Sequence, residues 1–342
     1  MAIRVRSILI GVLLVLVVLV AGGLTMIGWE VVLGPKARAT SAEPFERTDA
    51  RLARGKYLAE GPGHCFHCHS EHDLSVPEFP IIEAKKGAGW ELPVPELNNI
   101  AARNITQDLE TGIGAWTDDE IARAIREGVR RDGTALFPMM PYLAYANMDD
   151  EDVKAIVVYL RTIPPVRNVV PKRNLPGPLE YLVNTMPQPV TTPRGPHPSA
   201  TAVERGKYLA TIADCNGCHS PMTADGQFIA GLEFSGGNPF PNPPGAPMFA
   251  VNITPDASGI SHYDDALFRE TIRTGRLQGR VLFHVMPFLN YRNMTDEDLS
   301  DIFAYLRTLA PVRHRISNTD PPALCAVCGQ THGLGEMNVK GQ

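Results

Sequence analysis

The chain has 342 residues, of which 44% are hydrophobic, and this is enough to form the cores of about two domains of ordinary size. Its formal net charge is only −5, which gives no reason to expect a nucleic-acid-binding protein. The 30 glycines and 30 prolines imply long, turn-rich connections between compact units.

An uncharged apolar run occupies residues 7–29. At about 1.5 Å per residue, a helix of this length crosses a hydrocarbon core of about 30 Å. We therefore expect residues 1–30 to be a transmembrane anchor, followed by a linker at 31–48. The alternative is a signal peptide cleaved among the small residues of 37–44. Arg4 and Arg6 indicate a cytoplasmic N-terminus, which would place the body on the periplasmic side of a bacterial inner membrane.

The next feature is the sequence GPGHCFHCHS at residues 61–70. Three chemistries use such a cluster: a zinc site, a dithiol redox pair, and covalent haem attachment, for which Cys-x-x-Cys-His is the specific pattern. Cys65 and Cys68 stand about one helical turn apart, so both thiols can add to the vinyl groups of one porphyrin. His69 then follows as the proximal ligand of the iron.

The same pattern recurs as Cys215, Cys218 and His219, while the residues between the cysteines change. What repeats is therefore the set that haem attachment needs. A zinc site needs four ligands around one ion, whereas these motifs are 150 residues apart in the chain. The sequence predicts two covalently bound c-type haems.

The repeat extends beyond the motifs and keeps its order. The blocks at 53–70, 102–106 and 137–166 match those at 204–220, 250–254 and 283–312. We expect an all-α fold with two tandem domains at 49–163 and 204–312, each with long Gly/Pro-rich loops. Residues 164–203 hold ten prolines, so they cannot form one helix and are predicted to be an extended linker.

Three helices are expected in each copy. The first carries a glycine, Gly55 or Gly206, that would let another backbone come close. The middle one begins in the first copy with Thr117 and Glu120, the pattern of a capping box. The last has apolar residues at helical spacing, at 153–160 and 299–306, and is expected to be core.

The sixth ligand of each iron should come from a methionine, which would also raise the reduction potential. Two methionine pairs repeat: Met140 with Met286, and Met148 with Met294. The first pair precedes a proline on the loop before the last helix, where a rigid turn could hold the sulfur over the ring. We therefore predict Met140 and Met286 as ligands and the other pair as packing residues. His67 is not repeated and is expected to be solvated.

The C-terminal tail, 313–342, contains Cys325 and Cys328 followed by glycine where a haem motif has histidine. A disulfide between them is the favoured interpretation, because the predicted compartment is oxidising. Two alternatives are a third haem with His332 as its ligand, and a small metal site with Cys325, Cys328 and His332 that would need a fourth ligand from elsewhere.

The blocks RGKYL with Cys-x-x-Cys-His, NIT, TGIGAWTDDEIARAIREGVRRDG and MPY resemble the cytochrome c subunits of bacterial membrane-bound alcohol and sugar-acid dehydrogenases, over about 50–315. The resemblance implies a class I cytochrome c fold with His/Met-ligated haems. It also implies electron relay from a partner dehydrogenase towards quinone or an oxidase. Those subunits typically carry three haems, whereas this chain has two motifs.

The expected function is that of a membrane-anchored dihaem electron carrier and not an enzyme. Its partners would be redox proteins, such as a dehydrogenase, a cytochrome or an oxidase subunit, together with the inner membrane. It could alternatively be an assembly subunit of a larger respiratory complex. A dihaem enzyme of the peroxidase or sulfur-compound dehydrogenase type is the third hypothesis, and it requires one haem with an open or unusual sixth position.

Overall fold

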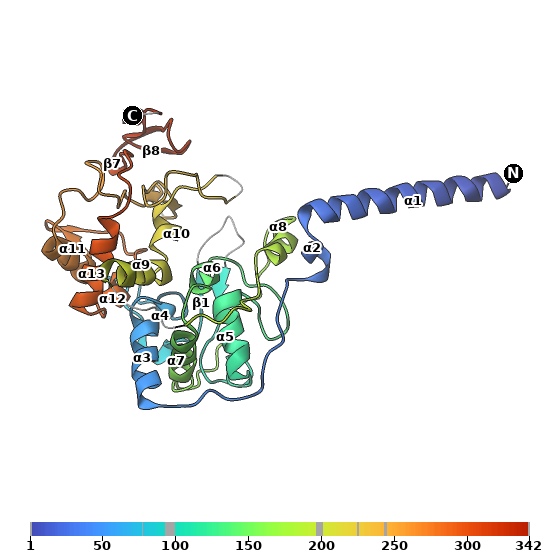
Figure 1. Cartoon of the computed structure of the whole chain (residues 1–342), viewed down its shortest axis with the longest axis horizontal. Helices are drawn as coiled ribbons and strands as arrows, with labels where there is room; N and C mark the ends of the chain where they lie inside the picture. Colours follow the sequence, from blue (N-terminus) through green and yellow to red (C-terminus); the bar gives the residue numbers. More distant parts are fainter. Residues whose placement is uncertain are drawn as a thin grey trace.

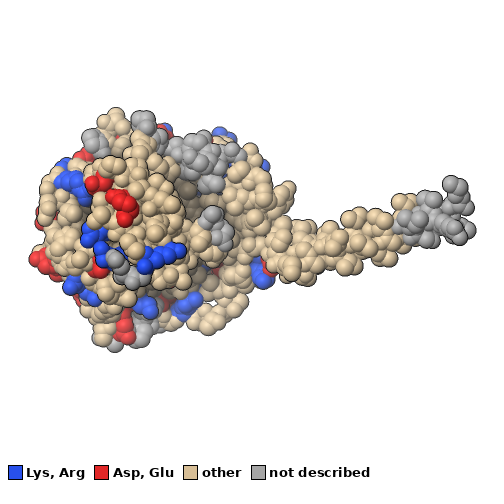
Figure 2. Space-filling model, turned by 90° about the horizontal axis from the view of Figure 1, so that it is seen from above, with Lys and Arg blue, Asp and Glu red and all other residues tan. Residues whose placement is uncertain are grey.

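The computed structural model describes residues 2–76, 78–92, 100–195, 201–223, 226–242 and 245–340, with side chains from residue 9 onward. One long helix, α1 (Ala2–Ile27), projects from a body that carries the rest of the chain, as Figures 1 and 2 show. Residues 196–200 of the predicted linker lie outside the described residues.

The body has two halves with the same order of helices, a β-hairpin standing between the second and third helix of each (Figure 1). The first contains α3 (Asp49–Glu60), α4 (Cys65–Cys68), η1 (Glu83–Lys85), β1 (Trp90–Leu92), β2 (Ile100–Ala102), α5 (Asp118–Glu127), α6 (Tyr142–Tyr145) and α7 (Asp150–Leu160). The second contains α9 (Ala202–Ile212), α10 (Cys215–His219), β3 (Pro239–Phe240), β4 (Met248–Phe249), α11 (Asp265–Thr274), β5 (Arg276–Leu277), β6 (Arg280–Val281), α12 (Phe288–Tyr291) and α13 (Asp296–Leu306).

Shorter elements connect and extend these halves. They are α2 (Glu30–Leu33) after the long helix, α8 (Leu179–Leu182) and η3 (Val183–Thr185) in the linker, and β7 (Ser317–Leu324), β8 (Thr331–Gly333) and η4 (Gly335–Met337) in the tail. The linker is thus partly helical. It also packs on the first half, since the backbone N–H of Asp150 donates to the carbonyl of Arg194 at 3.1 Å.

The first and last helices of each half cross in direct backbone contact. A Cβ built on Gly55 in α3 would lie 1.8 Å from the carbonyl oxygen of Ala155 in α7. The same holds for Gly206 in α9 and the carbonyl oxygen of Asp301 in α13, at 1.8 Å. The prediction that these glycines admit another backbone is confirmed at both positions.

The predicted helix signals also hold. Thr117 and Glu120 form a complete capping box at the start of α5. The apolar stripes of α7 and α13 are buried in the core, at Val153, Ile156, Val157 and Leu160 and at Leu299, Ile302, Phe303 and Leu306.

Short strands depart from the expected all-α fold. The four two-stranded pairs described are all antiparallel: β1 with β2, β3 with β4, β5 with β6, and β7 with β8. The first two lie in the Gly/Pro-rich loops that follow the two cysteine motifs. Pairing satisfies backbone polar groups that a loop would otherwise leave open. All described strands except the eight-residue β7 have two or three residues, which is too short to show a strand period in the sequence.

The two halves meet through a pair of equivalent tyrosines. The Tyr57 hydroxyl on α3 donates to the carboxylate of Asp298 on α13, and the Tyr208 hydroxyl on α9 donates to Asp152 on α7 at 2.7 Å. Each hydroxyl also accepts the backbone N–H three residues before its aspartate, at 3.3 Å in both cases. The tyrosine on the first helix of each half therefore contacts the last helix of the other half, in a pseudo-twofold arrangement.

We expect Gly55→Ala to lower the free energy of unfolding by about 3 kcal/mol, because the added methyl must push two helices apart. An alanine in an unobstructed helix interior would instead stabilise it by about 1 kcal/mol, so the sign is diagnostic. Urea unfolding followed by circular dichroism measures the change. Gly195→Ala is the control, since a Cβ there meets no atom of the described residues within 4 Å, and it should stay within about 0.5 kcal/mol of the parent. An equally stable Gly55→Ala protein would contradict the crossing.

Candidate haem-binding site

Each cysteine motif starts from a left-handed residue that turns the chain sharply into a short helix. His64 before α4 has φ of 34°, and Asp214 before α10 has φ of 52°. A tyrosine fixes the residue ahead of each turn: the Tyr145 hydroxyl donates to the Gly63 carbonyl at 2.6 Å, and the Tyr291 hydroxyl to that of Ala213 at 2.7 Å. The two motifs are therefore held in the same way.

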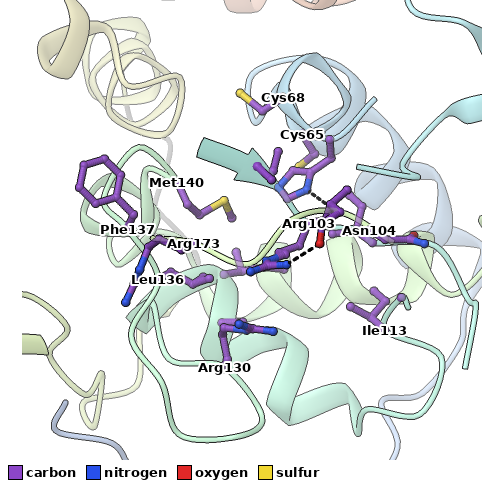
Figure 3. Close-up of a pocket in the computed structure, with 18 of the residues that line it drawn as sticks. Cys65, Cys68, Arg103, Asn104, Ile113, Arg130, Leu136, Phe137, Met140 and Arg173 are labelled. Carbon is purple, nitrogen blue, oxygen red and sulfur yellow. Dashed lines mark hydrogen bonds between the residues drawn. The ribbon is translucent and has the colours of Figure 1, made fainter. Parts of the chain in front are cut away.

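A cavity of about 840 Å³ lies beside α4. Cys65, Cys68 and His69 line it from one side, and the loop before α6 supplies Met140 from another. Figure 3 shows the Met140 side chain directed into this space, across from the two cysteines. The cavity thus brings together all four predicted ligand and attachment residues of the first copy.

The two motif histidines share one hydrogen-bonding arrangement. Nδ1 of His69 lies 2.6 Å from the carbonyl oxygen of Arg103, and Nδ1 of His219 lies 2.8 Å from that of Val251. A carbonyl only accepts, so Nδ1 carries the proton in both rings. Burial lowers the pKa of both imidazoles, which keeps them neutral. Nε2 is then the free ligand atom, and its orientation is fixed from behind.

Burial disfavours the thiolate form of all four motif cysteines. Burial raises the pKa of Cys65 to about 12 and that of Cys68 to about 11. It likewise raises the pKa of Cys215 and of Cys218 to about 12. A catalytic dithiol needs a thiol pKa lowered by positive surroundings, which is the opposite direction.

The two predicted methionines sit on matching turns. Met140 is half-buried, and its carbonyl accepts from the N–H of Tyr142 at 2.7 Å. Met286 is also half-buried, and its carbonyl accepts from Phe288 at 2.7 Å. The other pair is buried in the core, with Met148 at 0% and Met294 at 2% exposure, although Met148 also reaches the cavity wall. The assignment of Met140 and Met286 as ligands stays a prediction.

Three arginines line the cavity and were not singled out from the sequence: Arg103, Arg130 and Arg173 (Figure 3). Burial lowers the pKa of Arg103, and the charges of Arg130 and Arg173 lower it further. Such a cluster favours an anionic ligand, and the carboxylate-bearing propionates of a haem have that charge.

The prediction that His67 is solvated is wrong. Its ring lies 5.4 Å from that of His72 in an edge-on arrangement. Burial lowers the His67 pKa to about 3, with a smaller contribution from neighbouring histidines that include His284 of the second half. The physical reason is that the second half covers this face of α4. The residue pattern within the first half alone does not show such a contact.

The two motifs face each other across the contact between the halves. The His64 ring packs edge-on against Tyr291 of the second half, with ring centroids 5.7 Å apart. Asn290 and Asn293 of the second half donate to the carbonyl of Glu60, at 3.3 and 3.1 Å. The attachment sites of both copies are thus gathered at one interface.

Cys325 and Cys328 are free thiols, like the four motif cysteines. They lie in the tail beside the second half, together with His314 and His332. Sequence reasoning named His332 as a neighbour and missed His314.

Comparison with known proteins gives two results. Residues 52–164 match the family model "Cytochrome c". The chain is 29% identical to the gluconate 2-dehydrogenase cytochrome c subunit of Pantoea cypripedii, over 82% of this chain and 64% of the relative. It is 30% identical to the fructose dehydrogenase cytochrome subunit of Gluconobacter japonicus, over 81% of this chain and 56% of the relative. It thus spans about three-fifths of the length of these relatives.

A shorter relative is covered almost entirely. The "Diheme cytochrome c-type" protein of Cereibacter sphaeroides is 26% identical, over 79% of this chain and 90% of the relative. Residues 52–164 therefore form a cytochrome c domain, and the chain as a whole is similar to the cytochrome c subunits of bacterial dehydrogenases.

Proposed function

We propose that this chain is a membrane-anchored dihaem cytochrome c that carries electrons and performs no substrate chemistry of its own. The observation that carries the proposal is the cavity beside α4, where two thiols, a histidine, a methionine and three arginines converge. A cytochrome c domain supports covalent haem c, and the residues present fit that group in attachment, axial ligation and charge. Bound haem supplies one-electron chemistry at its iron.

In the first half, Cys65 and Cys68 would hold the haem by thioether bonds. His69 would bind the iron, oriented by the Arg103 carbonyl, and Met140 would be its second axial ligand. Residues 49–163 form most of this domain, and the linker adds Arg173 to the cavity wall. The structure thus supports a first domain that extends beyond its predicted end.

The second half supports a second haem by equivalence of its parts. Cys215 and Cys218 open α10, His219 has the backbone hydrogen bond of its counterpart, and Met286 stands on the matching turn. Residues 204–312 would then be a second cytochrome c domain. A dihaem relative of similar length agrees with two haems.

The contact between the halves suits transfer between two haems. Each motif precedes a proximal histidine, and the two motifs lie on facing sides of one interface through His64 and Tyr291. The tyrosine and aspartate pairs that join the halves fix this arrangement. Electrons would enter at one domain, cross here, and leave from the other.

The N-terminal helix would anchor the body. Leu9–Ile27 has a mean hydropathy of 2.8, and none of it is buried by the rest of the described chain. Where α2 and α8 pack at the base of this helix, apolar side chains stay exposed, among them Trp29, Leu33 and Tyr181. Exposed apolar and aromatic side chains at this position are typical of residues at a membrane interface. We place the haem domains in the periplasm and the N-terminus in the cytoplasm.

A dehydrogenase is the partner that the relatives favour, because several are named as cytochrome subunits of dehydrogenases. Membranes from cells that make the full chain should retain it through an alkaline carbonate wash. After detergent extraction, a native gel stained for haem should show it together with a dehydrogenase subunit. A soluble chain that begins within 37–44 would contradict the anchor, and migration as a lone chain would contradict the complex.

Replacing Met140 by alanine should lower the reduction potential of one haem, on the order of 0.1 V, because loss of the thioether ligand disfavours reduced iron. Met286→Ala should do the same to the other haem. Spectroelectrochemical titration of the full-length protein measures both potentials.

Met139→Ala is the matched control, since that neighbouring side chain is 40% exposed, and it should move neither potential. If Met148→Ala shifts a potential while Met140→Ala does not, the ligand is the other methionine. A high-spin haem in the unaltered, oxidised protein would instead favour the dihaem enzyme.

A further inference from the structure

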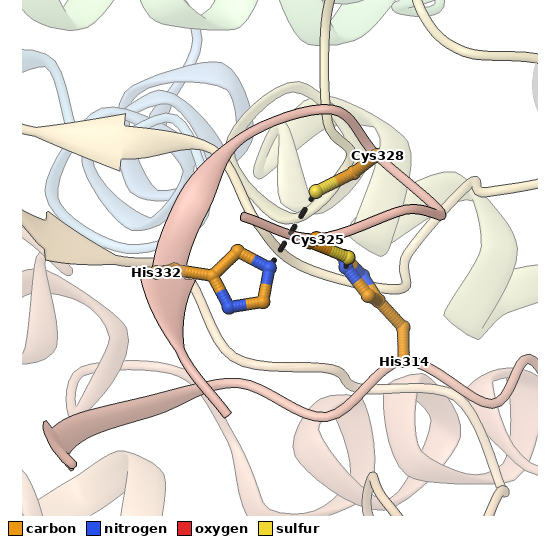
Figure 4. Close-up of side chains that lie close together, drawn as sticks. All are labelled: His314, Cys325, Cys328 and His332. Carbon is orange, nitrogen blue, oxygen red and sulfur yellow. Dashed lines mark hydrogen bonds between the residues drawn. The ribbon is translucent and has the colours of Figure 1, made fainter. Parts of the chain in front are cut away.

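The tail gathers two cysteines and two histidines into one buried cluster. Cys325 and Cys328 lie between β7 and β8, His332 is on β8, and His314 precedes β7 after α13. All four are buried, and their ligand atoms lie within 4.8 Å of one another. Figure 4 shows the two sulfurs and the two imidazoles directed toward a common centre.

Two sulfur–nitrogen distances in the cluster are those of ligands around one ion. Sγ of Cys325 lies 3.5 Å from Nε2 of His314, and Sγ of Cys328 lies 3.5 Å from Nε2 of His332. Tetrahedral zinc, with Zn–S of about 2.3 Å and Zn–N of about 2.0 Å, sets neighbouring sulfur and nitrogen atoms about 3.5 Å apart. Two sulfur and two nitrogen ligands in a closed site are a donor set typical of structural zinc.

Hydrogen bonds behind the ligands fix their orientation. Nδ1 of His314 donates to the carbonyl of Ser235 at 3.0 Å, and Nδ1 of His332 donates to that of Gly333 at 2.9 Å. Both rings therefore present Nε2 to the cluster, as metal-ligating histidines do. The Gln330 N–H also points at Sγ of Cys328, at 3.4 Å, within the turn that joins the two cysteines to β8.

The first half shows what His314 adds. Its equivalent there is Asn168, whose amide donates to the carbonyl of Ala88 at 3.0 Å. His314 makes the same bond to Ser235, the equivalent of Ala88. The packing contact is thus met by asparagine in one half and by histidine in the other. Only the half that is followed by the cysteine tail has the residue with a second, metal-binding nitrogen.

We propose that His314, Cys325, Cys328 and His332 bind one zinc ion that fastens the C-terminal tail to the second half. The loop held by His314 leads directly to Gly236, whose N–H donates to the carbonyl of His219 at 2.7 Å. The zinc would brace the backbone behind the proximal histidine of the second copy. Zinc has no redox chemistry, so the site would take no part in electron transfer, and its existence is independent of the proposed function.

A disulfide between Cys325 and Cys328 is the competing state. It would leave two buried, unprotonated imidazole Nε2 atoms facing disulfide sulfurs, which have no proton to donate. Zinc instead engages all four side chains at once. The two states exclude each other, since zinc needs both thiolates, and they differ in metal content and in mass.

The experiment is metal analysis of the full-length, haem-loaded protein, purified in detergent without chelator and dialysed against zinc-free buffer. We expect one zinc per chain, alongside the haem iron. X-ray absorption at the zinc edge should show two sulfurs at about 2.3 Å and two nitrogens at about 2.0 Å. His314→Asn keeps the hydrogen bond that Asn168 makes in the first half but removes a ligand, so its zinc content should fall at least tenfold.

His262→Asn is the control, because it removes an exposed histidine of the same half, and it should keep its zinc. Circular dichroism, measured in parallel, shows whether His314→Asn has folded; if it has not, the zinc-edge spectrum of the parent decides. The proposal is overturned if the parent contains no zinc, if peptide mapping without reductant finds Cys325 joined to Cys328, or if His314→Asn retains its metal. Haem loss does not enter this test, so a failure here leaves the electron-carrier proposal standing.

Discussion

Backbone contact between the first and last helices of each half sets the frame for everything else in the body. With no side chain at Gly55 or Gly206, the helix that leads into each cysteine motif lies directly on the helix that closes the half. That contact fixes where α4 and α10 begin. The middle helix and the methionine loop then enclose the space beside the motif. The missing side chain at each glycine therefore determines where the motif cysteines lie.

The two halves are alike in frame and different in environment. The residue whose carbonyl accepts from the motif histidine is Arg103 in the first half and Val251 in the second, so the first half has a positive charge that the second lacks at this place. The second half carries the cysteine tail, which the first lacks. The two halves therefore hold their motif histidines in the same way. They differ in the charge beside that histidine and in the presence of the cysteine tail.

Much of the fold could be predicted because the chain contains two copies of one pattern, which can be compared with each other. The two glycines, which recur in both copies, and the Thr117 capping box of the first copy were assigned with their roles. What the repeat does not contain was missed: the covering of His67 by the second half, the strands in the loops, and the linker's contribution of Arg173. The covering of His67 and the position of Arg173 depend on contacts between segments far apart in the chain, which neither periodicity nor motif spacing records. The loop strands pair locally but are too short to show a strand period. His314 was hidden for a related reason, since its partner in the first copy is an asparagine.

The proposed electron-carrier function requires two haems joined covalently to this one chain. The intact mass of the full-length protein, measured after denaturation so that only covalent groups remain, tests this directly. We predict the mass of the polypeptide plus two haem groups, with the added mass located on the peptides that contain Cys65 with Cys68 and Cys215 with Cys218. A mass equal to that of the bare polypeptide would contradict the account, and the addition of a single haem would confine it to one half.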